Sequence, residues 1–139
     1  MRQFPTGAVR NEDRFKYKAS EHPFPVDLPI YQVSDDKYAW VDYHDKKRPL
    51  DYALLPMTTV LGLLVHLTIG AENYGRHNWK KGIPLSSYYN SATRHLMQWW
   101  AGANDEPHLY SAFTNIMMAI WTEREIAKGR LPKELDDRV

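Results

Sequence analysis

Apolar and polar residues recur with a helical period in three segments of the second half of the chain. From residue 57 to about residue 73, apolar side chains stand three and four positions apart, which predicts a mostly buried helix. Its broad apolar face comprises Met57, Val60, Leu61, Leu64, Val65 and Thr68. Thr59, His66 and Asn73 repeat every seven residues and form a thin polar stripe. We expect the His66 ring to be hydrogen-bonded to a neighbour in the core rather than catalytic.

A second helix is predicted to begin at residues 85–87 and to end at Gly102. Pro84 with Ser86 or Ser87 supplies the start signals. The predicted apolar side carries Leu85, Tyr88, Tyr89, Ala92, Leu96, Trp99 and Trp100. His95 lies at the border of this side, where a structural role is the more common one.

A third helix is predicted over residues 107–128, and Asn104 or Asp105 is the expected cap. Its apolar face carries Leu109, Ala112, Phe113, Ile116, Met117, Ile120 and Trp121. His108 and Asn115 are seven residues apart and therefore lie along one edge of that face. Such an imidazole and amide can hold the core together or form the polar floor of a ligand cleft. The spacing leaves both alternatives open.

The first third of the chain lacks a helical period. Prolines at positions 23, 25 and 29 exclude a helix there and favour extended chain. Residues 31–33 and 38–43, with a turn at 34–37, form a candidate hairpin, and we expect residues 45–49 to be a solvated loop. We expect this region to be a structured surface arm rather than a functional lid.

These elements predict an all-α fold in a single domain over residues 1–139. Residues 1–52 would form an extended arm, residues 53–128 the helical core and residues 129–139 a tail. Three helices with this many aromatic residues leave much apolar surface uncovered when alone. We therefore expect a homodimer or a higher homo-oligomer to complete a helical bundle.

Composition narrows the classes of function. The formal net charge of +1 argues against nucleic-acid binding, so any recognition of anions has to come from a local cluster. The chain has no cysteine, which excludes disulfides and thiolate metal sites. Its longest apolar run, residues 60–69, is too short to span a bilayer, and the first residues lack the apolar segment of a signal peptide. We expect a cytoplasmic protein that does not act at a membrane.

Several separated motifs occur in an order that is typical of one known family. Near the front of the chain these are "TGAVR" (residues 6–10) and "RPLDYALLP" (residues 48–56). The remaining positions are Gly70, Ala71, Tyr74, Gly75, Asn78, Trp79, Gly82, Arg94, His95, Leu96, Gly102, Asp105, Glu106, His108, Leu109 and Asn115. Together they resemble the dATP/dGTP diphosphohydrolase N-terminal domain of phage and bacterial proteins, whose opening and link into the first helix the two front stretches match.

The resemblance implies an all-α fold related to the MazG-like nucleotide pyrophosphohydrolases and a phage source. It also implies a purine deoxynucleoside triphosphate substrate, cleaved to monophosphate and pyrophosphate with Mg²⁺ or Mn²⁺. Two features depart from the family pattern. Residues 11–47 are longer than the usual spacer, and Pro107 stands where an aspartate is common, which removes one possible metal-binding carboxylate.

Cleavage of a triphosphate needs a divalent cation, and Mg²⁺ prefers carboxylate oxygens. The helices carry few of them, and the acidic pairs three residues apart that MazG-like enzymes present are missing. Glu72, Asp105 and Glu106, together with His108, form the one plausible group at the edge of the core. We expect the three carboxylates to bind metal, and Glu72 and His108 to be catalytic.

Cationic side chains in or beside the matching segments are candidates for phosphate binding, because guanidinium groups bind phosphate bidentately. Trp79 could stack on a base or could instead fill the corner between the first two helices. The expected substrate-binding residues are Arg10, Arg48, Tyr74, Asn78, Trp79, Lys80, Arg94, His95 and Asn115.

Three functions therefore compete. The chain could be a metal-dependent nucleotide pyrophosphohydrolase, a non-catalytic nucleotide-binding protein of the same fold such as a phage sponge for a nucleotide signal, or a structural protein that uses the fold for assembly. The resemblance favours the first. The small number of carboxylates keeps the second open.

Overall fold

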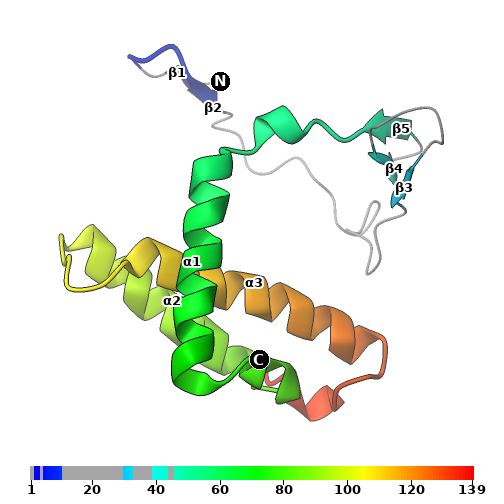
Figure 1. Cartoon of the computed structure of the whole chain (residues 1–139), viewed down its shortest axis with the longest axis vertical. Coiled ribbons are helices and arrows are strands. Elements are labelled where there is room, and N and C mark those ends of the chain that lie inside the picture. Colours follow the sequence, from blue (N-terminus) through cyan, green and yellow to red (C-terminus); the bar gives the residue numbers. More distant parts are fainter. Residues whose placement is uncertain (1, 4, 11–29, 33–38, 44–45) are drawn as a thin grey trace. The chain divides into compact units, whose positions relative to one another are not determined.

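The computed structural model describes residues 2–3, 5–10, 30–32, 39–43 and 46–139 (Figure 1). The chain divides into two compact units, Met1–Leu50 and Asp51–Val139. The described part of the first unit is built from short strands, and the second unit is helical.

The first unit contains two small antiparallel sheets. Strands β1 (Arg2–Gln3) and β2 (Val9–Arg10) form one, and β3 (Ile30–Gln32), β4 (Ala39–Tyr43) and β5 (Lys46–Pro49) form the other in that order. The β3–β4 pairing, with Tyr31 opposite Trp40, confirms the predicted hairpin, whose turn at residues 34–37 lies outside the described residues.

The prediction of a solvated loop at residues 45–49 is wrong for residues 46–49, which form β5 and pair with β4. Pro49 ends this strand, where its missing N–H costs no ladder hydrogen bond. Exposed lysines such as Lys46 are typical of sheet edges, so the charged composition concealed an edge strand.

The second unit confirms the three predicted helices, α1 (Met57–Tyr74), α2 (Leu85–Trp100) and α3 (His108–Ala127). Short 3₁₀ turns precede α1 (η1, Tyr52–Leu54), connect α1 to α2 (η2, Asn78–Lys81) and follow α3 (η3, Lys133–Leu135). Helices α2 and α3 pack side by side, and α1 crosses α3 (Figure 1). None of the helices in the described part of the chain has the length and apolar character needed to cross a bilayer.

Burial is concentrated at the α2–α3 contact. The buried apolar side chains of the described residues are Leu63, Leu85, Tyr88, Ala92 and Ala112. The prediction that α1 is mostly buried is wrong for this chain, since Leu61, Leu64 and Val65 are each more than half exposed. Helix α1 packs on α3 along one side, so its broad apolar face has no cover within the helical unit.

The crossing of α1 over α3 is very close. Gly62 faces the ring of Tyr110, and a Cβ atom on Gly62 would overlap the Tyr110 hydroxyl. That hydroxyl donates a hydrogen bond of 3.1 Å to the carbonyl oxygen of Thr59. Any larger residue at position 62 would therefore displace the Tyr110 side chain.

The corner between α1 and α2 is closed by Trp79. Its ring meets Trp121 of α3 edge-on, with ring centroids 4.9 Å apart and an interplanar angle of 82°. The ammonium of Lys80 lies 5.5 Å from the Trp79 ring centroid and 5.7 Å from that of Trp121. The packing alternative for Trp79 is thus present in the structure.

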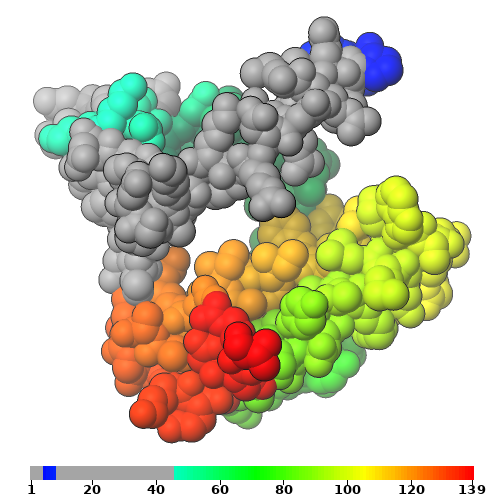
Figure 2. All heavy atoms as spheres, turned by 180° about the vertical axis from the view of Figure 1, so that it is seen from behind, coloured from blue at the N-terminus to red at the C-terminus, as the bar shows by residue number. Residues whose placement is uncertain are grey.

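The start of α2 is held by the C-terminal segment. Asp137 Oδ1 accepts a hydrogen bond of 2.9 Å from the Ser86 amide, and Asp137 Oδ2 accepts another from the Ser86 hydroxyl. In the space-filling view the red C-terminal residues lie against the ends of α2 and α3 (Figure 2). The predicted caps by Ser86 or Ser87 and by Asn104 or Asp105 are wrong, because prolines 84 and 107 occupy the N-cap positions without a side-chain hydrogen bond.

Candidate functional site

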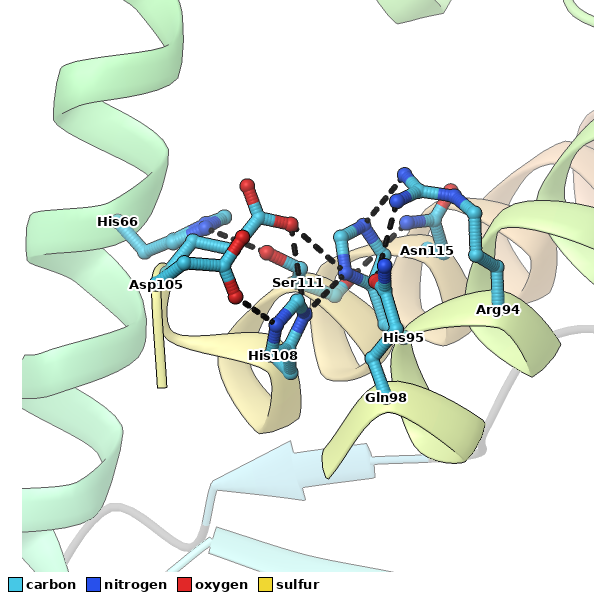
Figure 3. A network of polar contacts seen from close by, with 9 residues as sticks. His66, Arg94, His95, Gln98, Asp105, His108, Ser111 and Asn115 are labelled. Atoms are coloured by element: carbon cyan, nitrogen blue, oxygen red, sulfur yellow. Dashed lines mark hydrogen bonds and ion pairs between the residues drawn. The ribbon is translucent and has the colours of Figure 1, made fainter. Parts of the chain in front are cut away.

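Two buried histidines face each other between α2 and α3. His95 is 6% exposed and His108 is 3% exposed, and their Nδ1 atoms are 3.0 Å apart (Figure 3). His95 follows Tyr88 and Ala92 along the buried side of α2, and His108 begins α3. The helix contact therefore places two imidazoles from different elements in one polar cluster.

The turn before α3 adds two carboxylates to this pair. Glu106 Oε1 lies 3.1 Å from His95 Nδ1 and 3.4 Å from His108 Nδ1. Asp105 approaches from the other side, with Oδ1 2.8 Å from His108 Nε2. One oxygen of Glu106 therefore lies close to both rings. The Asp105 oxygen instead binds the other nitrogen of His108 and so orients that ring.

In a neutral ring, the partner of the outer nitrogen fixes which nitrogen carries the hydrogen. The Asp105 carboxylate can only accept, so His108 carries its hydrogen on Nε2. The Arg94 guanidinium can only donate, and its Nη2 lies 3.1 Å from His95 Nε2, so His95 carries its hydrogen on Nδ1. His108 Nδ1 and Glu106 Oε1 then face each other as two acceptors, and one hydrogen, from His95, serves both.

The electrostatic environment favours one charge state for His95 and one for Asp105. Burial, followed by the positive charge of Arg94, lowers the pKa of His95 and favours its neutral form. The hydrogen bond from His108 lowers the pKa of Asp105, which therefore remains a carboxylate. A neutral imidazole beside ionised carboxylates is an arrangement that attracts a cation.

His95, Glu106 and His108 could hold a divalent metal ion. Each offers one ligand atom, and these atoms lie within 4.8 Å of one another. Donors around an ion at about 2.1 Å stand roughly 3.0 to 3.4 Å apart, depending on coordination geometry, and the three pairs here fit that range. Asp105 bound to the far nitrogen of His108 is the usual carboxylate support of a metal-binding histidine.

A second polar group, around His66, joins α1 to α3. His66 Nε2 lies 3.2 Å from the Ser111 hydroxyl, and His66 Nδ1 lies 3.2 Å from the Thr114 hydroxyl. Asn115 donates a hydrogen bond of 2.8 Å to the carbonyl oxygen of Ser111 (Figure 3). The prediction that His66 is hydrogen-bonded to a neighbour is confirmed, and the bonds hold α1 to α3.

A cavity of about 790 Å³ is lined by α2, α3 and the C-terminal residues 137–139, and none of the three proposed metal ligands is among its lining residues. Its walls are largely apolar, including Tyr89, Leu96 and Ile116, and Asn115 contributes a polar group. Asn115 therefore belongs both to the packing network and to the lining of a cavity, so both alternatives considered for it stay open.

The structure brings together only part of the predicted site. Arg94, His95, Asp105, Glu106 and His108 form one network, whereas Asn115 bonds to Ser111, which belongs to the group around His66. Sequence reasoning missed the convergence of Glu106 on both histidines. The available signal was a histidine on the buried side of each of two consecutive helices.

The other predicted residues of the helical unit lie apart from this network, and two further ones belong to the first unit. Glu72 and Tyr74 are exposed at the end of α1, and Glu72 forms no hydrogen bond or ion pair with the described residues. Asn78, Trp79 and Lys80 belong to the α1–α2 corner. Arg48 lies on β5 of the first unit and Arg10 on β2, where the Arg10 side chain is outside the described residues.

Comparison with known proteins gives one family match. Residues 41–137 match the model of the family described as dATP/dGTP diphosphohydrolase, N-terminal. No curated protein and no solved structure matches the chain. The matched segment includes all three helices and the whole histidine and carboxylate cluster. The chain therefore belongs to the dATP/dGTP diphosphohydrolase N-terminal family.

Proposed function

We propose that the chain is a metal-dependent hydrolase of purine deoxynucleoside triphosphates, which cleaves them to monophosphate and pyrophosphate. The observation that carries the proposal is the convergence of His95, Glu106 and His108 on one point. Membership of a family described by dATP and dGTP hydrolysis supports the substrate class.

The proposed roles follow from the contacts of each residue. A divalent cation bound by His95, Glu106 and His108 would neutralise phosphate charge and lower the pKa of a bound water. Asp105 keeps His108 in the tautomer whose Nδ1 is free to bind. Arg94 is exposed beside the cluster, where its guanidinium can reach a phosphate.

The donor set favours one of the two expected cations. Mg²⁺ is usually bound by oxygen atoms, whereas this cluster offers two imidazole nitrogens and one carboxylate. Mn²⁺ binds such mixed sites more readily than Mg²⁺, and Zn²⁺ more readily still. We therefore propose that a transition-metal ion, with Mn²⁺ as the first choice to test, supports the activity better than Mg²⁺.

The test is release of pyrophosphate from dATP and dGTP in the presence of Mn²⁺. Glu106→Gln removes a proposed ligand without changing side-chain size, and we expect it to lower turnover by at least about 100-fold. Glu72→Gln is the matched control, because the same change falls on an exposed residue at the end of α1. Equal loss in both variants, with both still folded by circular dichroism, would contradict the proposed site.

A non-catalytic nucleotide-binding protein is the second candidate function. The single carboxylate among the three proposed ligands and the cavity of about 790 Å³ favour it. Its expected result is no pyrophosphate release, together with a rise in melting temperature when dATP or dGTP is added. If neither pyrophosphate release nor a rise in melting temperature is observed, the structural role is the one that remains. In each case we propose a second copy of the chain as a partner, since α1 leaves its apolar face uncovered.

A further inference from the structure

Arg94 is hydrogen-bonded to Nε2 of His95, the nitrogen of this proposed metal ligand that faces away from the cluster. Its Nη2 donates to His95 Nε2 at 3.1 Å, and its Nη1 donates to Gln98 Oε1 at 3.2 Å. The first bond requires a free electron pair on His95 Nε2, and therefore places the hydrogen of His95 on Nδ1. That atom is the one that faces Glu106 and His108.

The two histidines therefore differ in whether Nδ1 presents an electron pair or a hydrogen to a cation. His108 already presents a free electron pair at Nδ1, because Asp105 holds its hydrogen on Nε2. His95 presents N–H at the same point. A cation can bind His95 Nδ1 only if that hydrogen leaves, and a ring that stays neutral then carries one on Nε2.

The changed ring cannot keep its contact with Arg94. An N–H on His95 Nε2 would point at the guanidinium N–H of Arg94, and two donors at this distance repel each other. The positive charge of Arg94 would also lie beside a divalent cation. Because the Arg94 side chain is exposed, it is free to turn away.

We propose that cation binding at His95, Glu106 and His108 moves the His95 hydrogen from Nδ1 to Nε2 and releases Arg94 to bind a phosphate. Solvent takes up the first hydrogen ion and supplies the second, so the charge of the ring is unchanged. Arg94 then contributes to phosphate binding only when the cation is present. The tautomer change does not depend on the proposed function. The binding of a phosphate by the released Arg94 side chain rests on that function.

Ring ¹⁵N spectra of the labelled protein, recorded with and without Zn²⁺, test the tautomer change. We expect His108 to keep its hydrogen on Nε2 in both states and His95 to change from Nδ1–H to Nε2–H. A His95 ring that keeps its hydrogen on Nδ1 at saturating Zn²⁺ would overturn the inference. Since no nucleotide is present, this result is separate from any failure of hydrolysis.

Calorimetry with Arg94→Met tests the competition between Arg94 and the cation. Without nucleotide, we expect the variant to bind Zn²⁺ roughly 5- to 10-fold more tightly than the unmodified protein, because no hydrogen bond to His95 has to break. Arg124→Met, the same change on α3 about four turns after His108, is the control and should leave Zn²⁺ affinity unchanged. Unchanged or weaker Zn²⁺ binding by the Arg94 variant contradicts the competition.

Binding of dAMP tests the release of Arg94. We expect Arg94→Met to leave dAMP affinity unchanged without a cation and to weaken it roughly 10-fold when Mn²⁺ is bound. An equal effect in both states means that Arg94 is available throughout and overturns the coupling. Absence of dAMP binding in both states contradicts a phosphate role for Arg94, and leaves the spectroscopic result on His95 to decide the tautomer change.

Discussion

Trp79 contacts Trp121 edge-on and carries the ammonium of Lys80 near its ring. An aromatic pair with a nearby cation stabilises a fold beyond the apolar area that it buries. We therefore expect Trp79→Leu to lower the free energy of unfolding by about 1 to 2 kcal/mol, measured by urea denaturation.

Trp100→Leu provides the control for this change. Trp100 is 83% exposed at the end of α2, so the same substitution should alter stability little. If Trp79→Leu keeps full stability but weakens nucleotide binding, the base-stacking role considered for Trp79 is favoured over packing.

Individual members of the candidate site could be predicted from the sequence, but their meeting point could not. The spacing of His108 and Asn115 placed them along one helix edge, and charge identified Asp105 and Glu106 as possible ligands. Which nitrogen meets which oxygen depends on how α2 lies against α3 and on the side-chain rotamers. No residue spacing within one helix carries that information.

Helices α1 and α3 are in close contact at Gly62. Adding a methyl group there would push away the ring of Tyr110 and break its hydrogen bond to Thr59. We expect Gly62→Ala to lower the free energy of unfolding by about 1 to 3 kcal/mol, in spite of the better helix propensity of alanine. Thermal and urea unfolding both measure this change.

Gly70 allows a matched comparison on the same helix. No atom lies within 4 Å of a Cβ placed on Gly70, so Gly70→Ala should raise stability by about 0.5 to 1 kcal/mol through helix propensity alone. A stabilising effect at both glycines would show that the crossing of α1 and α3 is looser in solution.

The Asp137 cap makes the stability of α2 dependent on pH. The hydrogen bonds from Ser86 lower the pKa of Asp137 in the folded chain. A depressed pKa means that the stabilisation is present above the unfolded value of about 3.9 and is lost as the pH falls below it through the folded value. We expect lower protection of the Ser86 and Ser87 amides, relative to their intrinsic exchange rates, in this acid range.

Asp137→Asn should remove the acid-dependent part of this protection and raise the exchange rate of the Ser86 amide at neutral pH. Asp136→Asn is the control, because Asp136 pairs with Arg138 and makes no contact with the Ser86 amide. Identical exchange at Ser86 in the Asp137 variant and the unmodified protein would exclude the cap as a stabilising contact.

Periodicity predicted the three helices to within about two residues, because each has a long apolar repeat and proline or glycine near its ends. The caps were predicted wrongly for a physical reason. Local sequence suggested serine or aspartate beside each helix start, whereas the group that caps α2 is 51 residues away along the chain. A contact of such long range leaves no local pattern.

The helical unit exposes apolar side chains on two of its surfaces. Leu61, Leu64 and Val65 on α1 are more than half exposed, and Ile116 and Ile120 line the open cavity between α2 and α3. Sequence predicted this apolar surface but assigned too much of it to the core of a single chain. How much is covered depends on a partner, which periodicity within one chain does not describe.

We expect the protein to form a homodimer that covers this surface, measurable by sedimentation velocity. Ile120→Glu places a charge in the cavity between α2 and α3 and should weaken association by at least about 10-fold. Asn90→Glu, on an exposed position of α2, should leave it unchanged. A protein that sediments as a monomer before any substitution would refute the expectation.

The Asp137 contact also has a consequence for synthesis of the chain. When the ribosome has made Ser86, the residue that caps its helix is still 51 positions from being added. At bacterial rates of about 5 to 20 residues per second, that interval is roughly 3 to 10 s. During it, α2 has an open end and its partner α3 is incomplete. The first turn of α2 therefore stays uncapped until almost the whole chain has been made.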